Sequence, residues 1–184
     1  EGTQWSQDIQ CLDKFNDDNY ALSVHFYEPL NFTFQFVPGI KYPVKGKKPW
    51  NGATTRRHLA KYAKLAKTRK VPIFVGEFGV NARAGIYGED KWLRETLKAF
   101  NTYGFHWTYW TYKAIKNHMY PDGLCSYYPN DPWVSRPGPL MGWETFPEQW
   151  KSNRKAMIES WRTKNFAPHK YLIKVVQNAA RKNS

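Results

Sequence analysis

Three short segments of the chain place polar or aromatic side chains directly after an apolar run. They are residues 25–29 (HFYEP), 76–79 (GEFG) and 107–113 (WTYWTYK). When parallel strands close into a barrel, their carboxyl ends meet at one mouth, and the side chains there converge. The order of these segments therefore predicts one shared site that contains a carboxylate, a tyrosine, a histidine and aromatic rings.

Glu77 is the side chain in this set that is best placed to do chemistry. It ends an apolar run inside the sequence Gly-Glu-Phe-Gly, where glycines permit close approach of other groups. A carboxylate at a buried strand end needs a partner, because desolvating an unpaired charge is costly. Strand alternation puts His25 and Tyr27 on one side of their strand. The Tyr27 hydroxyl could then donate a hydrogen bond that keeps Glu77 ionised and oriented.

The aromatic residues predict a ligand with flat apolar faces. Trp110 offers such a face, and sugar rings stack their C–H groups on aromatic rings. The loop that follows could extend the cleft with Tyr120, Tyr127, Tyr128, Trp133 and Trp143. We also assign Trp5 and Lys113 to substrate binding.

Each of these residues has a structural interpretation as well. Glu77 could form a buried ion pair with Arg83 or with Lys113. His25 could be a satisfied core histidine, and each tryptophan could belong to the core or the rim. The three strand ends in this order favour the functional interpretation.

The elements that must position the site alternate between strand and helix. Apolar runs predict strands at 20–27, 71–75 and 105–112, and helical spacing predicts helices at 56–70, 89–103 and 147–164. The inward stripes are Leu59, Tyr62, Ala63 and Ala66, then Trp92, Leu93, Thr96, Leu97 and Phe100. This alternation predicts an α/β fold with parallel strands.

The ends of these elements can be predicted too. Thr54 or Thr55 should cap the helix at 56–70, and Gly104 should end the helix at 89–103. A long loop is expected at 116–146, and a short amphipathic piece (YLIKVV) before a polar tail.

The charge and composition exclude some classes of protein. Lys and Arg number 28 against 15 Asp and Glu, a formal charge of +13. The basic residues in 56–70 and 151–164 have helical spacing, which favours solvated helix faces over a nucleic-acid site. The sequence contains no run of 18 or more apolar residues, the length that a membrane helix needs, so it predicts no membrane helix. Cys11 and Cys125 define neither a disulfide framework nor a metal site, and could be bridged or free.

On these motifs, the chain resembles the C-terminal half of family 5 glycoside hydrolases, the cellulase and mannanase family of clan A. HFYEPLNFTFQ is similar to the sixth barrel strand of that family, VPIFVGEFG to the seventh and HWTYWTYK to the eighth. EGTQWS resembles the end of the fifth strand. The similarity covers residues 1–113 and extends to the helix expected at 147–164. The resemblance implies the C-terminal half of a (β/α)8 TIM barrel, about strands 5–8, forming one partial catalytic domain over residues 1–184.

The resemblance also implies roles for individual residues. Glu77 would be the nucleophile, Tyr27 its hydrogen-bond partner, and His25 a neighbour of the substrate or of the acid/base group. Trp110 would be the platform for the sugar that is cleaved. The implied reaction is retaining hydrolysis of a β-linked oligo- or polysaccharide through a covalent glycosyl-enzyme. It requires no metal or organic cofactor.

The chain departs from the family pattern at the second carboxylate. The family's acid/base glutamate lies in an Asn-Glu-Pro motif on the fourth strand, and this sequence has no such motif. Glu28-Pro29 imitates it, but alternation points Glu28 away from the side that Tyr27 faces. We therefore expect the chain alone to be inactive, and to pair with a complementary N-terminal half-barrel or with itself.

Two further expectations follow from the sequence. The alternative function is a non-catalytic carbohydrate-binding domain that uses the same aromatic cleft. A polymeric substrate suggests an extracellular location, and neither a nucleic acid nor a membrane is expected as a partner.

Overall fold

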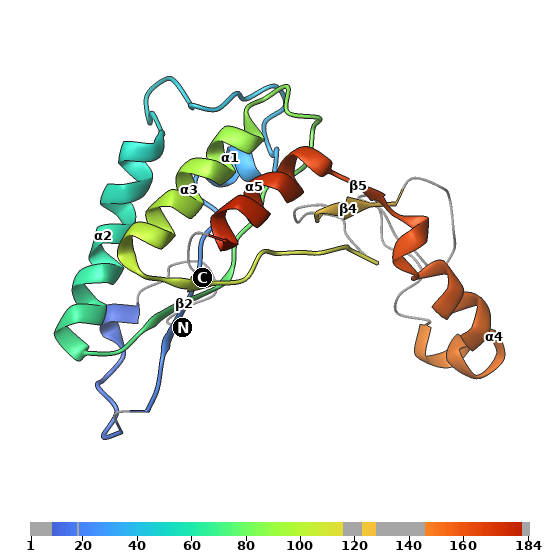
Figure 1. Cartoon of the computed structure of the whole chain (residues 1–184), viewed down its shortest axis with the longest axis horizontal. Helices are drawn as coiled ribbons and strands as arrows, with labels where there is room; N and C mark the ends of the chain where they lie inside the picture. Colours follow the sequence, from blue (N-terminus) through green and yellow to red (C-terminus); the bar gives the residue numbers. More distant parts are fainter. Residues whose placement is uncertain (1–8, 18, 116–122, 128–145, 182–184) are drawn as a thin grey trace.

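The computed structural model describes residues 9–17, 19–115, 123–127 and 146–181. Its centre is a parallel three-stranded sheet in the order β1 (Leu22–His25), β2 (Ile73–Glu77), β3 (His106–Trp107). Helix α2 (Gly52–Arg69) connects the first two strands, and α3 (Glu89–Tyr103) connects the second and third (Figure 1). The alternation of strand and helix, with parallel pairing, confirms the predicted α/β class.

The two faces of the sheet differ in their surroundings. Leu22 and Val24 of β1, and Ile73 and Val75 of β2, are buried in one apolar cluster with residues of α2 and α3. Between them on β2, Phe74 is exposed. Parallel sheets are normally covered on both faces. In this chain the helices cover one face, as they cover the outside of a barrel wall.

The inward stripes of the two long helices are where the sequence predicts them. In α2, Leu59 and Tyr62 are buried, and Ala63 and Ala66 pack against the same core. In α3 all five predicted residues are buried: Trp92, Leu93, Thr96, Leu97 and Phe100. Gly104 ends α3 in the left-handed conformation with φ 67°, as expected.

The start of α2 differs from the prediction. Asn51, rather than Thr54 or Thr55, is the N-cap, and its Oδ1 accepts from the amides of Ala53 and Thr54 at 3.0 and 3.1 Å. Thr55 is buried, and its hydroxyl accepts from the Trp50 indole at 2.9 Å. An asparagine at this position therefore starts the helix four residues earlier than expected.

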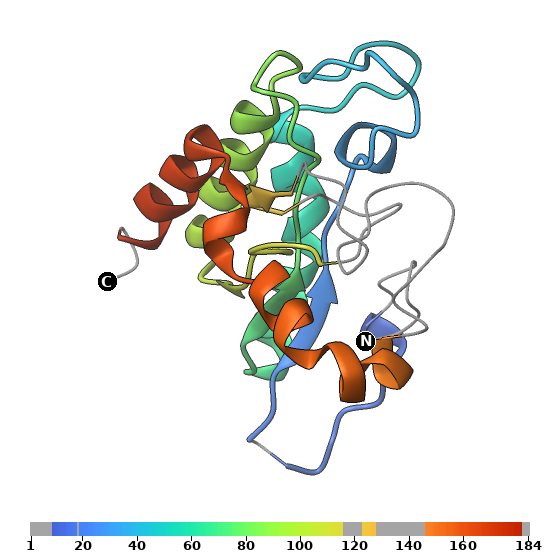
Figure 2. The same cartoon turned by 90° about the vertical axis from the view of Figure 1, so that its right-hand side faces the viewer.

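The largest correction concerns the last helix of the sheet layer. Helix α5 (Lys170–Ala180), and not the helix predicted at 147–164, packs beside α3 (Figures 1 and 2). It buries Leu172 and Val175, and its Ala179 carbonyl accepts from the Asn101 side chain at 3.1 Å. The piece predicted as short and amphipathic is thus the third helix that covers the sheet.

The predicted third strand, 105–112, is shorter as a strand but continues as an extended segment. Thr108 N donates to Val75 O at 3.0 Å, and Trp110 N donates to Phe78 O at 2.8 Å. After β3, every second residue of this segment thus still donates a backbone hydrogen bond to β2 or to the residues that follow it.

Part of the predicted loop at 116–146 contains structure. Strand β4 (Cys125–Ser126) pairs antiparallel with β5 (Ala167–Pro168). Helix α4 (Phe146–Ser160) lies away from the sheet, at the far end of the molecule (Figure 1). The short elements η1 (Ile9–Cys11), α1 (Leu30–Thr33) and η3 (Thr163–Asn165) complete the described chain.

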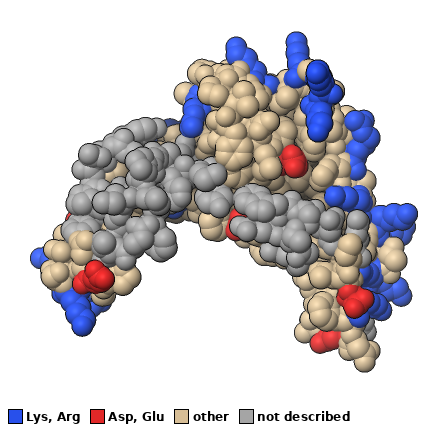
Figure 3. Space-filling view, turned by 180° about the vertical axis from the view of Figure 1, so that it is seen from behind, with Lys and Arg blue, Asp and Glu red and all other residues tan. Residues whose placement is uncertain are grey.

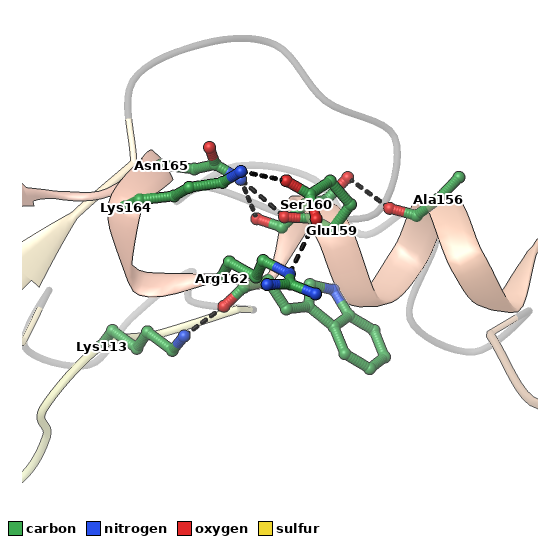
Figure 4. Close-up of polar contacts among 8 residues, drawn as sticks. Lys113, Ala156, Glu159, Ser160, Arg162, Lys164 and Asn165 are labelled. Carbon is green, nitrogen blue, oxygen red and sulfur yellow. Dashed lines mark hydrogen bonds and ion pairs between the residues drawn. The ribbon is translucent and has the colours of Figure 1, made fainter.

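Helix α4 ends at Ser160 rather than at residue 164. The Asn165 side chain donates to the carbonyls of Glu159 and Ser160, at 2.6 and 3.3 Å (Figure 4). The Glu159 carboxylate pairs with Arg162 at 2.7 Å and also with Lys164. These contacts fold the chain back at the end of α4. The helix therefore stops at Ser160, although the helical spacing of the sequence continues to residue 164.

The surface matches the expected solvated helix faces. Lys and Arg side chains are prominent on the side of the molecule that α2 forms (Figure 3). Those that α2 exposes are Arg56, Arg57, Lys61, Lys64 and Lys67. Cys11 is exposed and Cys125 is buried, and both are free thiols. No helix in the described ranges is both long and apolar enough to cross a bilayer.

Candidate active site

The carboxyl ends of β1 and β2 bring two candidate residues together. The strands pair in parallel with Val24 opposite Val75, and a register shift then places His25 opposite Glu77. Phe26 N donates to Glu77 O at 2.8 Å, which locks this register. The irregularity sets two polar side chains side by side where the apolar strands end.

The Glu77 carboxylate has a tyrosine partner. The Tyr27 hydroxyl donates to Glu77 Oε2 at 2.9 Å, and His25 Nδ1 lies 3.5 Å from the same oxygen. The side chains of His25 and Glu77 are 23% and 28% exposed, so both can be reached from solvent. Both contacts use Oε2, and among the described residues no hydrogen bond engages Oε1. Both partners therefore hold the carboxylate through the same oxygen, Oε2.

Tyr27 is itself held by the turn that follows β1. Its ring packs edge-on against Phe34 at 5.1 Å, and its carbonyl accepts from the Thr33 hydroxyl at 2.6 Å. Asn81 ties this turn to the loop after β2, because its amide donates to Thr33 O and its side chain to Phe34 O, each at 2.8 Å. The two loops therefore position the phenol jointly.

Gly76 leaves room for the side chain of Ser23 on the neighbouring strand. A Cβ at this position would lie 3.2 Å from Ser23 Oγ and 3.6 Å from His25 Nε2. The first distance is tighter than ordinary van der Waals contact, so a larger residue would displace the side chains on the open face of β1. The sequence predicts that glycine permits close approach of other groups, and the groups that approach Gly76 are side chains of this chain.

Trp110 lies on the extension of the third strand. Its backbone amide donates a hydrogen bond to the carbonyl of Phe78, the residue after Glu77, so Trp110 lies beside the end of β2. Its side chain is 41% exposed. The three strand ends that the sequence singles out are therefore neighbours at one edge of the sheet. Of the other predicted aromatic residues, Tyr127 packs against Phe166 at 5.1 Å, and the rest lie outside the described residues: Trp5, Tyr120, Tyr128, Trp133 and Trp143.

Lys113 has a different environment from the one expected. Its ammonium contacts the Trp161 carbonyl (Figure 4). It also lies 3.3 Å from Thr163 Oγ1 and 5.0 Å from the centre of the Phe166 ring. These contacts fasten the segment after α4 to the strand extension. They do not support the assignment of Lys113 to substrate binding, nor the ion pair with Glu77.

Glu28 belongs to a turn rather than to the site. Its carboxylate accepts from the Leu30 amide at 3.4 Å, and its carbonyl accepts from the Trp92 indole at 3.0 Å. These contacts tie Glu28 to the start of α1 and to the core. The arrangement agrees with the expectation that Glu28 does not share the side of Tyr27.

Two positioning residues were not singled out from the sequence. Asn81 joins the two loops, and Glu89, which is buried at the start of α3, accepts hydrogen bonds from the loop at 83–87. The available signals were an asparagine shortly after a strand end and an acid at a helix N-terminus. Within the ranges described, no group of three or more His, Cys, Asp or Glu side chains could hold a metal ion.

The fold and the site together define a class. A parallel sheet covered by helices, with an accessible carboxylate and aromatic residues at its carboxyl edge, is the arrangement of α/β-barrel hydrolases. The cellulase model of glycosyl hydrolase family 5 matches residues 1–116. The chain belongs to glycosyl hydrolase family 5. No curated protein matches it at a significant level.

Solved structures agree with this assignment. A hyperthermophilic endo-beta-1,4-glucanase, solved in complex with substrate, is 30% identical with a TM-score of 0.52, over 74% of this chain and 42% of that one. A broad-specificity GH5-4 endoglucanase from Clostridium cellulovorans is 15% identical with a TM-score of 0.56, over 89% and 37%. At that identity it shows the fold alone. The chain therefore spans about two fifths of the length of these structures, as expected for part of a TIM barrel.

Proposed function

We propose that this chain supplies the nucleophile, Glu77, of a retaining β-glycoside hydrolase whose acid/base carboxylate lies elsewhere in the barrel. The observation that supports this most directly is the 2.9 Å hydrogen bond from the Tyr27 hydroxyl to Glu77 Oε2. It orients the carboxylate through Oε2, and in the proposal Oε1 is the attacking oxygen. The family membership and the endoglucanase relatives favour a β-linked glycan as the substrate.

In the proposed reaction, Glu77 Oε1 attacks the anomeric carbon of the bound sugar, and the bond to the leaving oxygen breaks. The acid/base carboxylate protonates that oxygen and later activates the water that hydrolyses the glycosyl ester. Tyr27 keeps the nucleophile in place through both steps. His25, 3.5 Å from Oε2, borders the same space, and Trp110 offers the apolar face on which the sugar ring stacks.

The retaining mechanism requires two carboxyl groups about 5–5.5 Å apart. Glu28 is engaged in the turn before α1 and is not proposed as the second one. We infer that a complementary N-terminal half-barrel supplies it, and that the chain alone is inactive on natural glycans. The exposed Phe74 on the open face of the sheet supports such pairing, with self-pairing as the alternative. A polymeric substrate leads us to propose an extracellular location.

Covalent labelling tests the nucleophile without the missing acid. From a dinitrophenyl glycoside the dinitrophenolate leaves as a stable anion and needs no proton, while the glycosyl group is transferred to the carboxylate. A 2-fluoro substituent slows hydrolysis of the ester that forms. We expect the chain to gain the mass of one 2-deoxy-2-fluoroglycosyl group, and peptide mapping to place it on Glu77. The experiment is run on the chain alone and on the chain mixed with an N-terminal half-barrel of a family member.

Two variants make the labelling specific. Glu77→Gln should abolish it, whereas Glu28→Gln, the matched change at the neighbouring acid, should leave it intact. Label on Glu28, or no label in either preparation while circular dichroism shows folded chains, would contradict the proposal. Oligosaccharide binding without any labelling would instead favour the non-catalytic carbohydrate-binding domain.

A further inference from the structure

A row of aromatic rings leads from the Glu77 partner to the surface. The Tyr27 ring contacts Phe34 edge-on at 5.1 Å, and Phe36 stacks on Phe34 at 5.1 Å with 29° between the ring planes. Tyr27 and Phe34 are buried, whereas Phe36 is 49% exposed. Because Phe34 covers one face of the Phe36 ring, the exposed area includes the opposite face. The row thus ends in a flat apolar surface.

The backbone that presents this ring is held in an uncommon conformation. Gln35 has φ 55°, in the left-handed region that residues with a Cβ rarely adopt. Its side chain donates to Phe32 O at 2.9 Å, and its amide donates to the same carbonyl at 3.2 Å. Such conformations persist where surrounding contacts over-determine them, and they concentrate at ligand sites.

The residues that precede Phe36 are also hydrogen-bonded to the loops of the candidate site. The Asn81 side chain donates to Phe34 O at 2.8 Å, and the Thr33 hydroxyl donates to Tyr27 O at 2.6 Å. The turn from Thr33 to Phe36 is therefore fixed to both loops that position the phenol. A ligand that stacks on Phe36 meets a preformed surface and loses little free energy in ordering it.

We propose that Phe36 is a stacking platform for a sugar unit of a β-linked glycan, at a subsite separate from the unit attacked by Glu77. This inference rests on the proposed function and extends it. Phe36 lies two ring contacts of 5.1 Å each from the Tyr27 ring, a separation that one glycan chain can span. The C–H groups of a pyranose ring match the open face of the phenyl ring.

A glycan fits this surface better than a protein partner does. The only other strongly exposed apolar side chain in the described part of this turn is Val37. A specific protein interface takes about 20–30 residues a side, far more than this patch provides. A single sugar ring, in contrast, is covered by one aromatic face. The continuity with Tyr27 and Glu77 indicates the same polymer that the site acts on.

The test is a titration with β-1,4-linked hexasaccharides of glucose and of mannose, followed by calorimetry and by backbone amide signals in NMR. We expect the signals of Phe36 and Val37 to shift. Phe36→Ala should weaken hexasaccharide binding about tenfold, and Phe36→Trp should retain or strengthen it. Disaccharide binding should be the same in all variants, because a disaccharide can occupy the Glu77 region alone.

Phe15→Ala is the matched control, since Phe15 is also an exposed ring packed on another one, Tyr20, at 5.2 Å, and precedes β1. It should leave hexasaccharide affinity unchanged. An unchanged affinity in Phe36→Ala, or no hexasaccharide binding by the parent chain, alone or with the N-terminal half, overturns the inference. So does a change of self-association in Phe36→Ala without a change of affinity.

These outcomes separate the inference from the proposed function. Labelling of Glu77 together with no effect of Phe36→Ala would leave the nucleophile in place and remove the platform. A tenfold loss in Phe36→Ala without labelling of Glu77 would remove the nucleophile and keep the platform.

Discussion

Two carboxylates, Glu77 at the end of β2 and Glu89 at the start of α3, lie twelve positions apart in opposite situations. Glu77 accepts from one phenol, that of Tyr27, and its side chain is 28% exposed. Glu89 is 1% exposed and accepts from three backbone amides, those of Arg83 at 2.7 Å, Gly85 at 2.8 Å and Tyr87 at 3.1 Å.

Each carboxylate also has a tyrosine. The Tyr171 hydroxyl, from α5, donates to Glu89 Oε1 at 3.0 Å. Burial, followed by the Glu89 charge, raises the pKa of Tyr171, so the phenol stays protonated and remains a donor. The same pair of residue types thus serves two purposes. Glu89 accepts several donors and so stabilises the loop at 83–87 and joins α5 to it. Glu77, with one phenol as its donor among the described residues, is the carboxylate that we propose as the nucleophile.

The sharpest test of this contrast is Glu77→Gln. We expect the rate of glycosyl labelling to fall by about three orders of magnitude or more, because an amide is a poor nucleophile. The free energy of unfolding should change by less than about 1 kcal/mol, since the side chain is partly exposed. Mass spectrometry gives the rate and urea denaturation the stability. A loss of stability comparable with that of a Glu89 variant would break the comparison.

Glu89→Ala should show the reverse pattern. Three amides and a phenol lose their acceptor inside the core, and we expect unfolding to become easier by about 3–5 kcal/mol. The midpoint of urea denaturation measures this loss. Glu89→Gln keeps the size and one acceptor oxygen, so its loss should be smaller. If Glu89→Ala costs less than about 1 kcal/mol, its hydrogen bonds do not hold the loop.

The two tyrosines provide a matched pair of smaller changes. Tyr27→Phe should slow labelling about 10- to 100-fold, the equivalent of one hydrogen bond to a charged group, with little effect on stability. Tyr171→Phe should lower stability by about 1–3 kcal/mol and leave labelling by the folded chain nearly unchanged. Both variants need the labelling rate and the urea midpoint. Equal effects on both properties in both variants would contradict the division of roles.

The contrast also shows how far the sequence could predict this molecule. The stripes at Leu59 and Tyr62, and at Trp92 and Leu97, were predictable because helical periodicity and burial agree there. The meeting of Tyr27 with Glu77 followed from strand order and the rule for barrel mouths. These features depend on local pattern together with one topological rule.

The errors occur where contacts outside the periodic pattern decide. Helix α5 was underestimated, although Leu172, Val175, Val176 and Ala179 follow helical spacing, because its partner α3 is far away in the sequence. The role of Glu89 depends on Tyr171, 82 positions later, and no local pattern reports such a contact. The end of α4 depends on the Asn165 side chain folding back onto the helix terminus.

A third polar group, the partly buried His58 in α2, shows how burial among aromatic rings affects a titratable side chain. It packs among the rings of Phe26, Trp50 and Tyr62, at 5.8, 5.6 and 6.2 Å. Burial, with a smaller contribution from the Lys61 charge, lowers the pKa of His58 from 6.5 to about 4. In the unfolded chain the imidazole takes up a proton near pH 6.5, whereas the folded chain resists protonation until about pH 4. The contribution of His58 to stability is therefore complete above pH 6.5 and is lost as the pH falls from 6.5 toward 4.

Replacing His58 by Gln should flatten this dependence, because no titrating group remains at the position. Urea midpoints at pH 7, 5.5 and 4.5 would show a smaller decline in His58→Gln than in the parent chain. His106→Gln, the same change at an exposed histidine of β3, should leave the decline as it is. A parallel decline in His58→Gln and the parent chain would mean that groups other than His58 account for all of the acid sensitivity in this range.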